Sequence, residues 1–320
     1  MSLEIKNLKV YYQTLRGQVK ALDDISFKIN DGDILGLAGE SGCGKSTFSN
    51  SLILLKAPMK YIGGEVFLDG KKLPVENYEK MKEKRYKDIS IIPQYALNAM
   101  NPTVKIGKYI HDVFAYKNFS YKGVDNELKR RLKIVGLDEG ILNMYPIELS
   151  GGMKQRMVMV IATLMNPSLL IADEITSALD VSTQKAVSKM LVEFRDKKFV
   201  KSIIFVTHDV SVLYQIADKI LIMYAGKFAE IGPAEKIIHN PRHVYTKLLV
   251  KAMPEVGIKF SDTPLTGIPG HPPLLIDPPE GCRFIDRCPE KMKECVKEPP
   301  VIKVGEDHYV ACWKEVKKNA

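Results

Sequence analysis

Residues 39–46 read Gly39-Glu40-Ser41-Gly42-Cys43-Gly44-Lys45-Ser46, which matches the pattern G-x-x-x-x-G-K-[S/T] at every fixed position. A compact apolar run at 34–38 precedes this stretch, as a buried strand would, and a helical pattern follows it to residue 55. The glycines let the backbone curl so that successive N–H groups point at phosphate oxygens, and the following helix adds its positive end. We therefore predict a phosphate-binding loop between a strand and a helix.

The side chains of this loop predict a nucleoside triphosphate with Mg²⁺ as its ligand. Lys45 supplies a point charge to the β- and γ-phosphates, and the Ser46 hydroxyl can ligate Mg²⁺. The Cys43 thiol is interpreted as a small packed side chain. The other predicted nucleotide contacts from this segment are Gly39, Ser41, Gly42, Cys43, Gly44 and Thr47.

Two carboxylates follow a second apolar run, at 169–172. Asp173 at the strand tip can hold Mg²⁺ through its water shell, and Glu174 is placed to polarise a water that attacks the γ-phosphate. A strand ending in Asp-Glu is weak evidence alone and often only a capped strand. Together with the phosphate loop it predicts an ATPase.

The chain as a whole predicts an α/β fold. Apolar strands at 34–38, 89–92, 169–172 and 203–206 are separated by helical patterns, which is typical of a parallel sheet. Short alternating strands over 3–31 predict an antiparallel β subdomain, and helical periodicity predicts a helical insertion at about 100–155. From 254 onward prolines are frequent and periodicity is lost. We expect an ATPase domain at 1–253 and a loop-rich C-terminal extension at 254–320.

Composition narrows the class of protein. A hydrophobic content of 45% with 27% charged residues is typical of a globular protein. No run of about 20 apolar residues could span a bilayer, and the start lacks the layout of a signal peptide. We expect a cytoplasmic protein, and any membrane role would have to come through a partner. The net charge is +9, and its densest basic stretch, 80–87, is interpreted as a solvated loop rather than a nucleic-acid patch.

A third motif separates this chain from other phosphate-loop proteins. It reads Leu149-Ser150-Gly151-Gly152-Met153-Lys154-Gln155-Arg156 and resembles the signature Leu-Ser-Gly-Gly-Gln of the ABC ATPase family, with Met153 in place of Gln. In that family the signature of one subunit caps the γ-phosphate held by the phosphate loop of another. Ser150 and the amides of Gly151 and Gly152, at a helix N-terminus, offer suitable donors to an anion.

The same resemblance implies further site residues, in the family's order. Gln94 matches the glutamine that senses Mg²⁺ and contacts the membrane subunit, and His208 matches the switch histidine near the γ-phosphate. Residues 177–180 match the loop at the dimer interface. Tyr12 aligns with the aromatic residue that stacks on adenine, with Tyr11 as the alternative. Ile175 stands where the family usually has Pro.

The extension resembles that of oligopeptide and dipeptide importer ATPases. The matching residues are Ile268-Pro269-Gly270-His271-Pro272-Pro273, Pro279-Glu280-Gly281-Cys282-Arg283-Phe284 and Arg287-Cys288-Pro289. This resemblance implies a second ATPase subunit, identical or related, two transmembrane permease subunits and an extracytoplasmic solute-binding protein. It also implies a position on the inner face of the cell membrane. Sugar and nickel importers share the extension, so the solute is less certain than the mechanism.

Four cysteines in this extension predict a metal site. Cys282, Cys288, Cys295 and Cys312 are spaced C-x5-C-x6-C-x16-C. Disulfides are disfavoured in a reducing cytoplasm, and structural zinc prefers closer pairs. A [4Fe–4S] cluster is the first interpretation, although no standard ferredoxin spacing is matched; Zn²⁺ is second, and four unrelated thiols are third.

Two other functions stay open at this stage. One is a soluble ABC ATPase that acts on nucleic acid or ribosomes, but such proteins usually carry long coiled coils or two cassettes, which are not seen here. The other is a redox sensor that uses a cysteine-bound cluster to control its ATPase.

Overall fold

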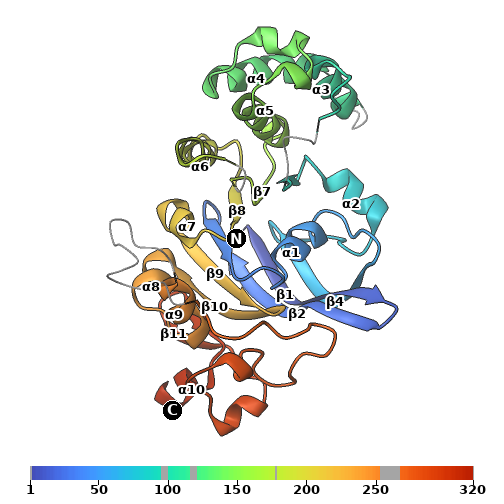
Figure 1. Ribbon diagram of the computed structural model, residues 1–320. Helices are drawn as coiled ribbons and strands as arrows, with labels where there is room; N and C mark the ends of the chain where they lie inside the picture. Colours follow the sequence, from blue (N-terminus) through green and yellow to red (C-terminus); the bar gives the residue numbers. More distant parts are fainter. Residues whose placement is uncertain (1, 95–99, 116–120, 177–178, 253–266, 320) are drawn as a thin grey trace.

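The computed structural model describes residues 2–94, 100–115, 121–176, 179–252 and 267–319. A helical region lies at the upper end of Figure 1, and two β-sheets with the C-terminal extension lie below it. Within these residues the larger sheet has eight strands in the order β11-β12-β10-β9-β3-β8-β7-β6, and the smaller has four in the order β2-β1-β4-β5. The strands of the larger sheet are β3 (Ile34–Ala38), β6 (Ile89–Ile92), β7 (Leu169–Asp173), β8 (Ser202–Val206), β9 (Lys219–Tyr224), β10 (Lys227–Pro233), β11 (Ile302–Gly305) and β12 (His308–Val310).

The parallel strands at the centre of the larger sheet are buried on both faces. Every residue of β3, β7 and β8 is buried, and β3, β6, β7, β8 and β9 pair in parallel. Because successive side chains point to opposite faces, Leu170 and Phe205 enter one core and Ile171 and Val206 enter a second. Because these strands run parallel, their carboxyl ends meet at one edge of the sheet, as the four apolar runs predicted.

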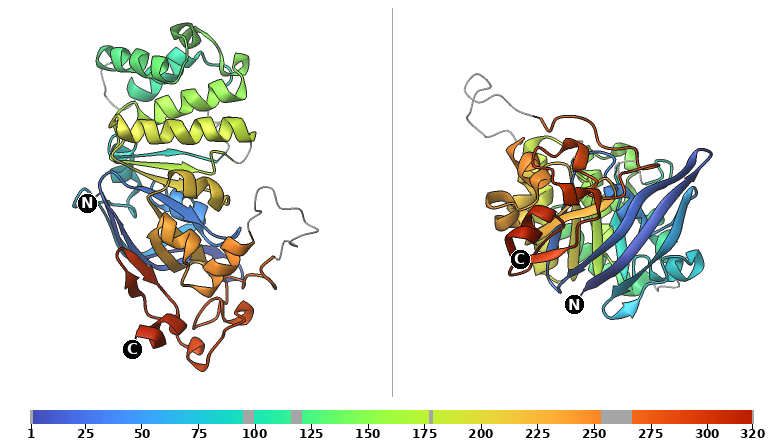
Figure 2. Two further views of the ribbon diagram at one scale, coloured as in Figure 1. Left: turned by 90° about the vertical axis from the view of Figure 1, so that its left-hand side faces the viewer. Right: turned by 90° about the horizontal axis from the view of Figure 1, so that it is seen from below.

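The smaller sheet is antiparallel, as predicted, but its first strands are long. Its members are β1 (Leu3–Thr14), β2 (Gly17–Ile29), β4 (Met59–Leu68) and β5 (Lys71–Lys72). The prediction of short strands is wrong, since β1 has 12 residues and β2 has 13. Register shifts after Ile5 and Val10 mark bulges, which bend a strand and let it stay paired along a curved surface. The right view of Figure 2 shows these long strands beside the larger sheet.

The helices confirm the predicted helical insertion and correct two predictions, the end of the helix after the phosphate loop and the nature of the stretch 80–87. The helices are α1 (Lys45–Ser51), α2 (Tyr78–Lys84), α3 (Ile106–Ala115), α4 (Tyr121–Ile134), α5 (Gly151–Thr163), α6 (Val181–Asp196), α7 (Val210–Ile216), α8 (Ala234–His239), α9 (Val244–Lys251) and α10 (Trp313–Asn319). The helix α1 ends at Ser51 rather than at residue 55. The basic stretch 80–87 is not simply a loop, because α2 covers its first part: Asn77 caps the helix, accepting from Lys80 N at 3.0 Å, and Met81 is buried.

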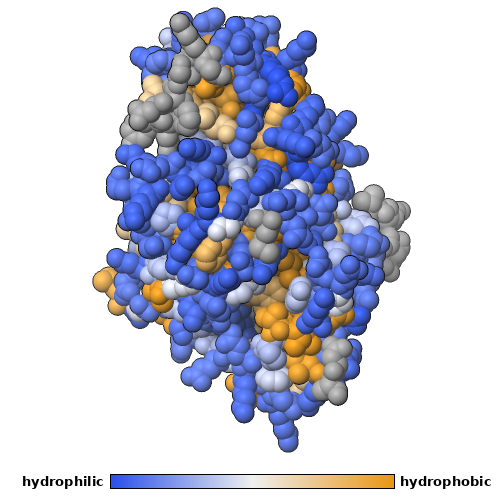
Figure 3. Space-filling model, turned by 180° about the vertical axis from the view of Figure 1, so that it is seen from behind, coloured by the Kyte–Doolittle hydropathy of each residue, from blue (hydrophilic) through white to orange (hydrophobic). Residues whose placement is uncertain are grey.

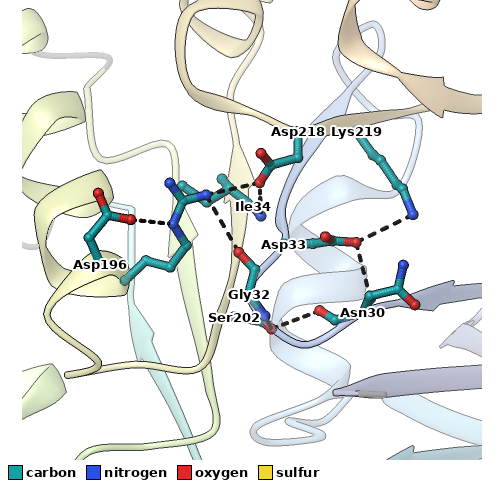
Figure 4. A network of polar contacts seen from close by, with 9 residues as sticks. Asn30, Gly32, Asp33, Ile34, Asp196, Ser202, Asp218 and Lys219 are labelled. Atoms are coloured by element: carbon teal, nitrogen blue, oxygen red, sulfur yellow. Dashed lines mark hydrogen bonds and ion pairs between the residues drawn. The ribbon is translucent and has the colours of Figure 1, made fainter.

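Polar contacts fix the end of β3 that lies away from the phosphate loop (Figure 4). The Asp218 carboxylate accepts hydrogen bonds from Ile34 N at 2.7 Å and from the Arg195 guanidinium at 3.0 Å. At the start of β8 the Ser202 hydroxyl donates to the Asn30 carbonyl at 3.0 Å. These bonds tie β3, β8 and β9 together, so the loops at their opposite ends are held in fixed relative positions.

The C-terminal extension is loop-rich, as predicted, but it also adds to the larger sheet. β12 pairs antiparallel with β10, placing Val310 opposite Glu230, and β11 pairs with β12. In the left view of Figure 2 the extension lies at the lower end of the molecule, opposite the helical region. The predicted domain boundary at 254 falls within 253–266, outside the described residues.

Hydrophilic side chains cover most of the face shown in Figure 3, with apolar patches between them. Among the described residues, no helix combines the length and the apolar character that a membrane span requires.

Candidate nucleotide-binding site

The loop at 39–46 connects β3 to α1, as predicted, and two of its glycines have no substitute. Gly39 has φ 148° and Gly44 has φ 109°, a region that side-chain-bearing residues rarely adopt. A Cβ on Gly39 would collide with the Met223 carbonyl oxygen, and one on Gly44 would collide with that of Ala21. Both the positive φ values and the close neighbouring backbone therefore require glycine at these two positions of the curled loop.

Lys45 is folded back into this loop. Its side chain is 5% exposed, and Nζ donates to the Gly39 carbonyl at 2.7 Å and to the Glu40 carbonyl at 3.1 Å. The Cys43 thiol lies 3.7 Å from the same ammonium and is buried, in agreement with its interpretation as a packed side chain. The ammonium is thus held at the centre of the loop, where phosphate oxygens would replace the carbonyls as its acceptors.

A cavity of about 490 Å³ opens above the phosphate loop. It brings together residues that are far apart in the sequence, including the three predicted catalytic residues Glu174, His208 and Gln94. The predicted residues that line it are Tyr12, Ser41, Gly42, Gly44, Lys45, Ser46, Thr47, Gln94, Glu174 and His208. Gly39, Cys43 and Asp173 do not line it, and the last two are 3% and 2% exposed.

Asp173 ends β7 as a buried carboxylate. Burial, together with the charge of Glu174, raises its pKa from 3.8 to about 6, although Ser49 and Lys45 act in the opposite direction. Its Oδ1 has no hydrogen-bond partner within the described part of the chain. A buried carboxylate oxygen of this kind suits a hard divalent cation. Asp173, Ser46 and Gln94 are the residues that would hold Mg²⁺.

Glu174 and Gln94 contact each other directly. Gln94, two residues after the end of β6, donates from Nε2 to Glu174 Oε2 at 2.8 Å. Glu174 N in turn donates to the Val206 carbonyl at 2.9 Å. Gln94 thus contacts the Glu174 carboxylate, and the bond to Val206 fixes the Glu174 backbone at the cavity. A carboxylate in such a position is a candidate general base.

The two candidate tyrosines have different positions. Tyr12 lines the cavity, and its hydroxyl lies 3.0 Å from Thr47 Oγ1. Tyr11 is buried and donates to Asp23 Oδ1 at 2.6 Å, away from the cavity lining. The geometry therefore favours Tyr12 over Tyr11 as the residue beside the base.

The signature residues are not part of this cavity. Ser150 caps α5 and accepts from Met153 N at 3.3 Å. A Cβ on Gly151 or Gly152 would meet nothing within 4 Å, so both glycines face open space. The side chain of Gln155, on the same helix, donates to the Ile175 carbonyl and thus joins α5 to the turn that follows Glu174.

The predicted dimer-interface loop is only partly described. Ser177 and Ala178 lie outside the described residues. Asp180 caps α6, accepting from Thr183 N at 3.0 Å, and the hydrogen bonds from Ser182 and Thr183 hold its pKa well below the usual range.

The four cysteines of the extension are neighbours, but a metal site is not confirmed. Burial, with smaller contributions from the nearby Cys295, Cys312 and Cys288, raises the pKa of Cys282 to about 12. Cys282 N donates to the Cys295 carbonyl at 2.9 Å. Within the described ranges, however, no group of three or more metal-binding side chains converges on a point where an ion could sit. The thiols are gathered in one unit without the geometry of a coordination shell.

Both parts of the chain match known protein families. Residues 22–177 match the model of the ABC transporter family, and residues 229–295 match the C-terminal region of oligopeptide/dipeptide transporters. The oligopeptide transport ATP-binding protein OppD of Bacillus subtilis is 39% identical over 97% of this chain and 88% of its own length. The chain belongs to the ABC transporter ATPases of the oligopeptide/dipeptide branch.

Other relatives of this ATPase are consistent with this family assignment. The dipeptide transport ATP-binding protein DppD of Bacillus subtilis is 39% identical over 97% of the chain and 94% of its own length. OppD of Escherichia coli is 37% identical over 99% of the chain and 94% of its own length. A solved ATP-binding cassette, described as a dimer in a post-hydrolysis state bound to ADP and Pi, has a TM-score of 0.62 and 25% identity, covering 72% of this chain and 98% of its own. These likenesses favour the transporter over the two other functions left open by the sequence.

Three residues that line the cavity, Val19, Ala21 and Leu275, were not among the predicted site residues. Leu275 of the extension lines the nucleotide cavity with Tyr12, Val19 and Ala21. Its carbonyl accepts a hydrogen bond from Lys20 N at 2.8 Å, which places this part of the extension alongside β2. A leucine in a proline-rich segment carries no local signal for such a role, so only the fold reveals it.

Proposed function

We propose that this ATPase energises a membrane importer for oligopeptides or dipeptides. The observation that carries the proposal is the single cavity in which Lys45, Gln94, Glu174 and His208 meet, in a chain that also has the transporter C-terminal region. The triphosphate of ATP would lie in the phosphate loop, with the base against Tyr12.

The chemistry follows from what each group is placed to do. Lys45 would neutralise charge on the β- and γ-phosphates, and Glu174 would accept the proton of the attacking water. His208 would contact the γ-phosphate from the end of β8. Mg²⁺, when bound, would neutralise phosphate charge. Gln94, which donates to Glu174 in this structure, would turn toward Mg²⁺ when the site is loaded.

The site would be completed by a second ATPase subunit, identical or related. Gly151 and Gly152 face open space, and Ser150 caps a helix whose positive end suits an anion. The γ-phosphate of ATP held in the phosphate loop of a partner would be that anion. The pair would lie beneath two transmembrane permease subunits on the inner face of the cell membrane, and a solute-binding protein would deliver the peptide outside. No nucleic-acid partner is expected.

Co-purification from membranes tests this proposal. The tagged full chain should recover two multi-spanning membrane proteins, and peptide together with the solute-binding protein should stimulate ATP hydrolysis by that complex. Lys45→Ala should recover the same proteins without hydrolysis. Recovery of ribosomes or nucleic acid, with no membrane protein, would contradict the transporter.

For the extension we propose that Cys282, Cys288, Cys295 and Cys312 bind a [4Fe–4S] cluster, with Zn²⁺ as the second candidate. Clustered thiols in a loop-rich unit support the proposal. The chain purified without oxygen should contain about four iron and four sulfide. Replacing any of these cysteines by Ser should remove the metal, whereas Cys43→Ser should leave it in place. A chain without iron or zinc under these conditions would refute the site.

A further inference from the structure

Arg287 of the extension holds the phosphate loop through the side chain of Glu40, which has no part in the proposed catalytic scheme. Arg287 Nη1 donates to Glu40 Oε2 at 2.6 Å, and Nη2 donates to Glu40 Oε1 at 3.0 Å. Such two-pronged arginine–carboxylate pairs fix both distance and orientation. Arg287 is itself held, since Nε donates to the Pro269 carbonyl at 2.8 Å and Nη1 donates to the Tyr224 hydroxyl at 3.1 Å.

Glu40 is the second residue of the phosphate loop and is linked to its lysine. The Glu40 carbonyl accepts from Lys45 Nζ at 3.1 Å, and Glu40 N donates to the Tyr245 hydroxyl at 2.8 Å. The carboxylate, the carbonyl and the amide of one residue therefore connect the extension, the phosphate-binding ammonium and α9. A movement of Arg287 would be passed to Lys45 through a single residue.

A second arginine from the same segment supports the other side of the loop. Arg283 Nη1 donates to the Ala225 carbonyl at 2.9 Å, and the next residue, Gly226, donates from N to the Cys43 carbonyl at 2.9 Å. Arg283 is anchored by Asp23 at 2.5 Å. The loop is thus braced from the extension at two points, of which only the Arg287 contact reaches a loop side chain directly.

Charge explains why the Arg287 contact matters for nucleotide binding. Without its partner, the Glu40 carboxylate would be an unbalanced negative charge next to the loop that receives phosphates, and it would compete for Lys45. We propose that Arg287 is a positioning residue of the nucleotide site: its ion pair with Glu40 keeps the phosphate loop ready for ATP. The C-terminal extension thereby sets the affinity of this ATPase for nucleotide.

The affinity for a fluorescent ATP analogue with Mg²⁺, measured on the full chain, tests the proposal. Arg287→Met should raise Kd on the order of tenfold, because the partly buried Glu40 carboxylate loses its partner. It should also raise KM in ATP hydrolysis while kcat at saturating ATP stays within about twofold. Arg287→Lys should restore part of the affinity, since a point charge cannot form the two-pronged pair.

The double variant Glu40→Gln with Arg287→Met separates positioning from general damage to the fold. Removing the carboxylate should bring Kd back to that of Glu40→Gln alone, because no unpaired charge remains. Asp307→Asn is the matched control: it breaks another pair between the extension and the sheet, Asp307 with Lys219 at 2.8 Å, away from the loop, and should leave Kd unchanged. A wild-type Kd for Arg287→Met, or a double variant that binds more weakly than Glu40→Gln alone, would overturn the proposal.

Discussion

Glu174 occupies an unusual backbone conformation. Its φ of 48° lies in the left-handed region, which costs a residue with a side chain on the order of 1 kcal/mol. The bond from Glu174 N to the Val206 carbonyl and the contact of Gln155 with the Ile175 carbonyl hold the turn on both sides. This turn directs the Glu174 side chain into the cavity while Asp173 stays in the buried strand, so two adjacent carboxylates serve different tasks.

Glu174→Gln should retain ATP binding and lower turnover by about 10²–10⁴-fold, the usual cost of losing a general base. The amide has the same shape and can still contact Gln94, so the loop should keep its geometry. Steady-state hydrolysis and nucleotide titration on the same preparation check both parts. Glu193→Gln, which alters an exposed carboxylate on α6, serves as the control. Hydrolysis near the wild-type rate would remove Glu174 from its proposed role.

Among the elements, α9 depends on a buried histidine. His243 caps this helix, its Nδ1 accepting from Tyr245 N at 3.0 Å, and it is 4% exposed. Burial lowers the pKa of His243 from 6.5 to about 4; the charge of Glu230 opposes this shift and that of Lys247 adds to it. Between these pH values the unfolded chain binds the proton and the folded chain does not.

Stability should therefore fall as the pH decreases from 6.5 to 4, and above 6.5 this residue should contribute no pH dependence. The loss from His243 amounts to about 3 kcal/mol at most. His243→Asn keeps a capping side chain but cannot titrate, so its unfolding free energy should change less between pH 7 and pH 5. Denaturant melts of both proteins at the two pH values give the comparison. If the unfolding free energy of both proteins changes equally between pH 7 and pH 5, His243 is not the source of the acid sensitivity.

Local patterns account for the elements that the sequence predicted. The phosphate loop and Asp173-Glu174 are contiguous motifs next to apolar strands, and the resemblance to the ABC ATPase family implied Gln94 and His208. Leu275 and Arg287 could not be found in this way. Both reach the site from a segment without periodicity, and Arg287 meets Glu40 across 247 residues of sequence. The hairpin of β11 and β12 was missed because two short edge strands carry too few alternating positions.

For the whole molecule, the outward-facing signature implies that each chain carries two half-sites. In a dimer of two copies, Lys45→Ala damages one half-site and Gly151→Asp damages the other. Each variant alone should be inactive. An equal mixture should recover roughly a quarter of wild-type hydrolysis, since half of the dimers are mixed and each has one intact composite site.

Mixing Lys45→Ala with Glu174→Gln is the matched control. Both changes affect the same half-site, so no mixed dimer contains an intact one and no activity should return. Hydrolysis measured after subunit exchange, with sedimentation to verify dimer formation, distinguishes the two mixtures. If Lys45→Ala and Gly151→Asp also fail to complement although mixed dimers form, the two motifs do not meet across the interface.

The ion pair of Arg287 with Glu40 has a consequence for the order of events during synthesis. The phosphate loop leaves the ribosome first, and its anchor follows 247 residues after Glu40, on the order of tens of seconds later at the usual rate of translation. A nascent chain therefore displays the complete nucleotide motif before it has a complete nucleotide site. A premature stop codon shortly before codon 287 would leave every sequence motif of the cassette intact, and the proposal predicts a subunit with weakened affinity for ATP.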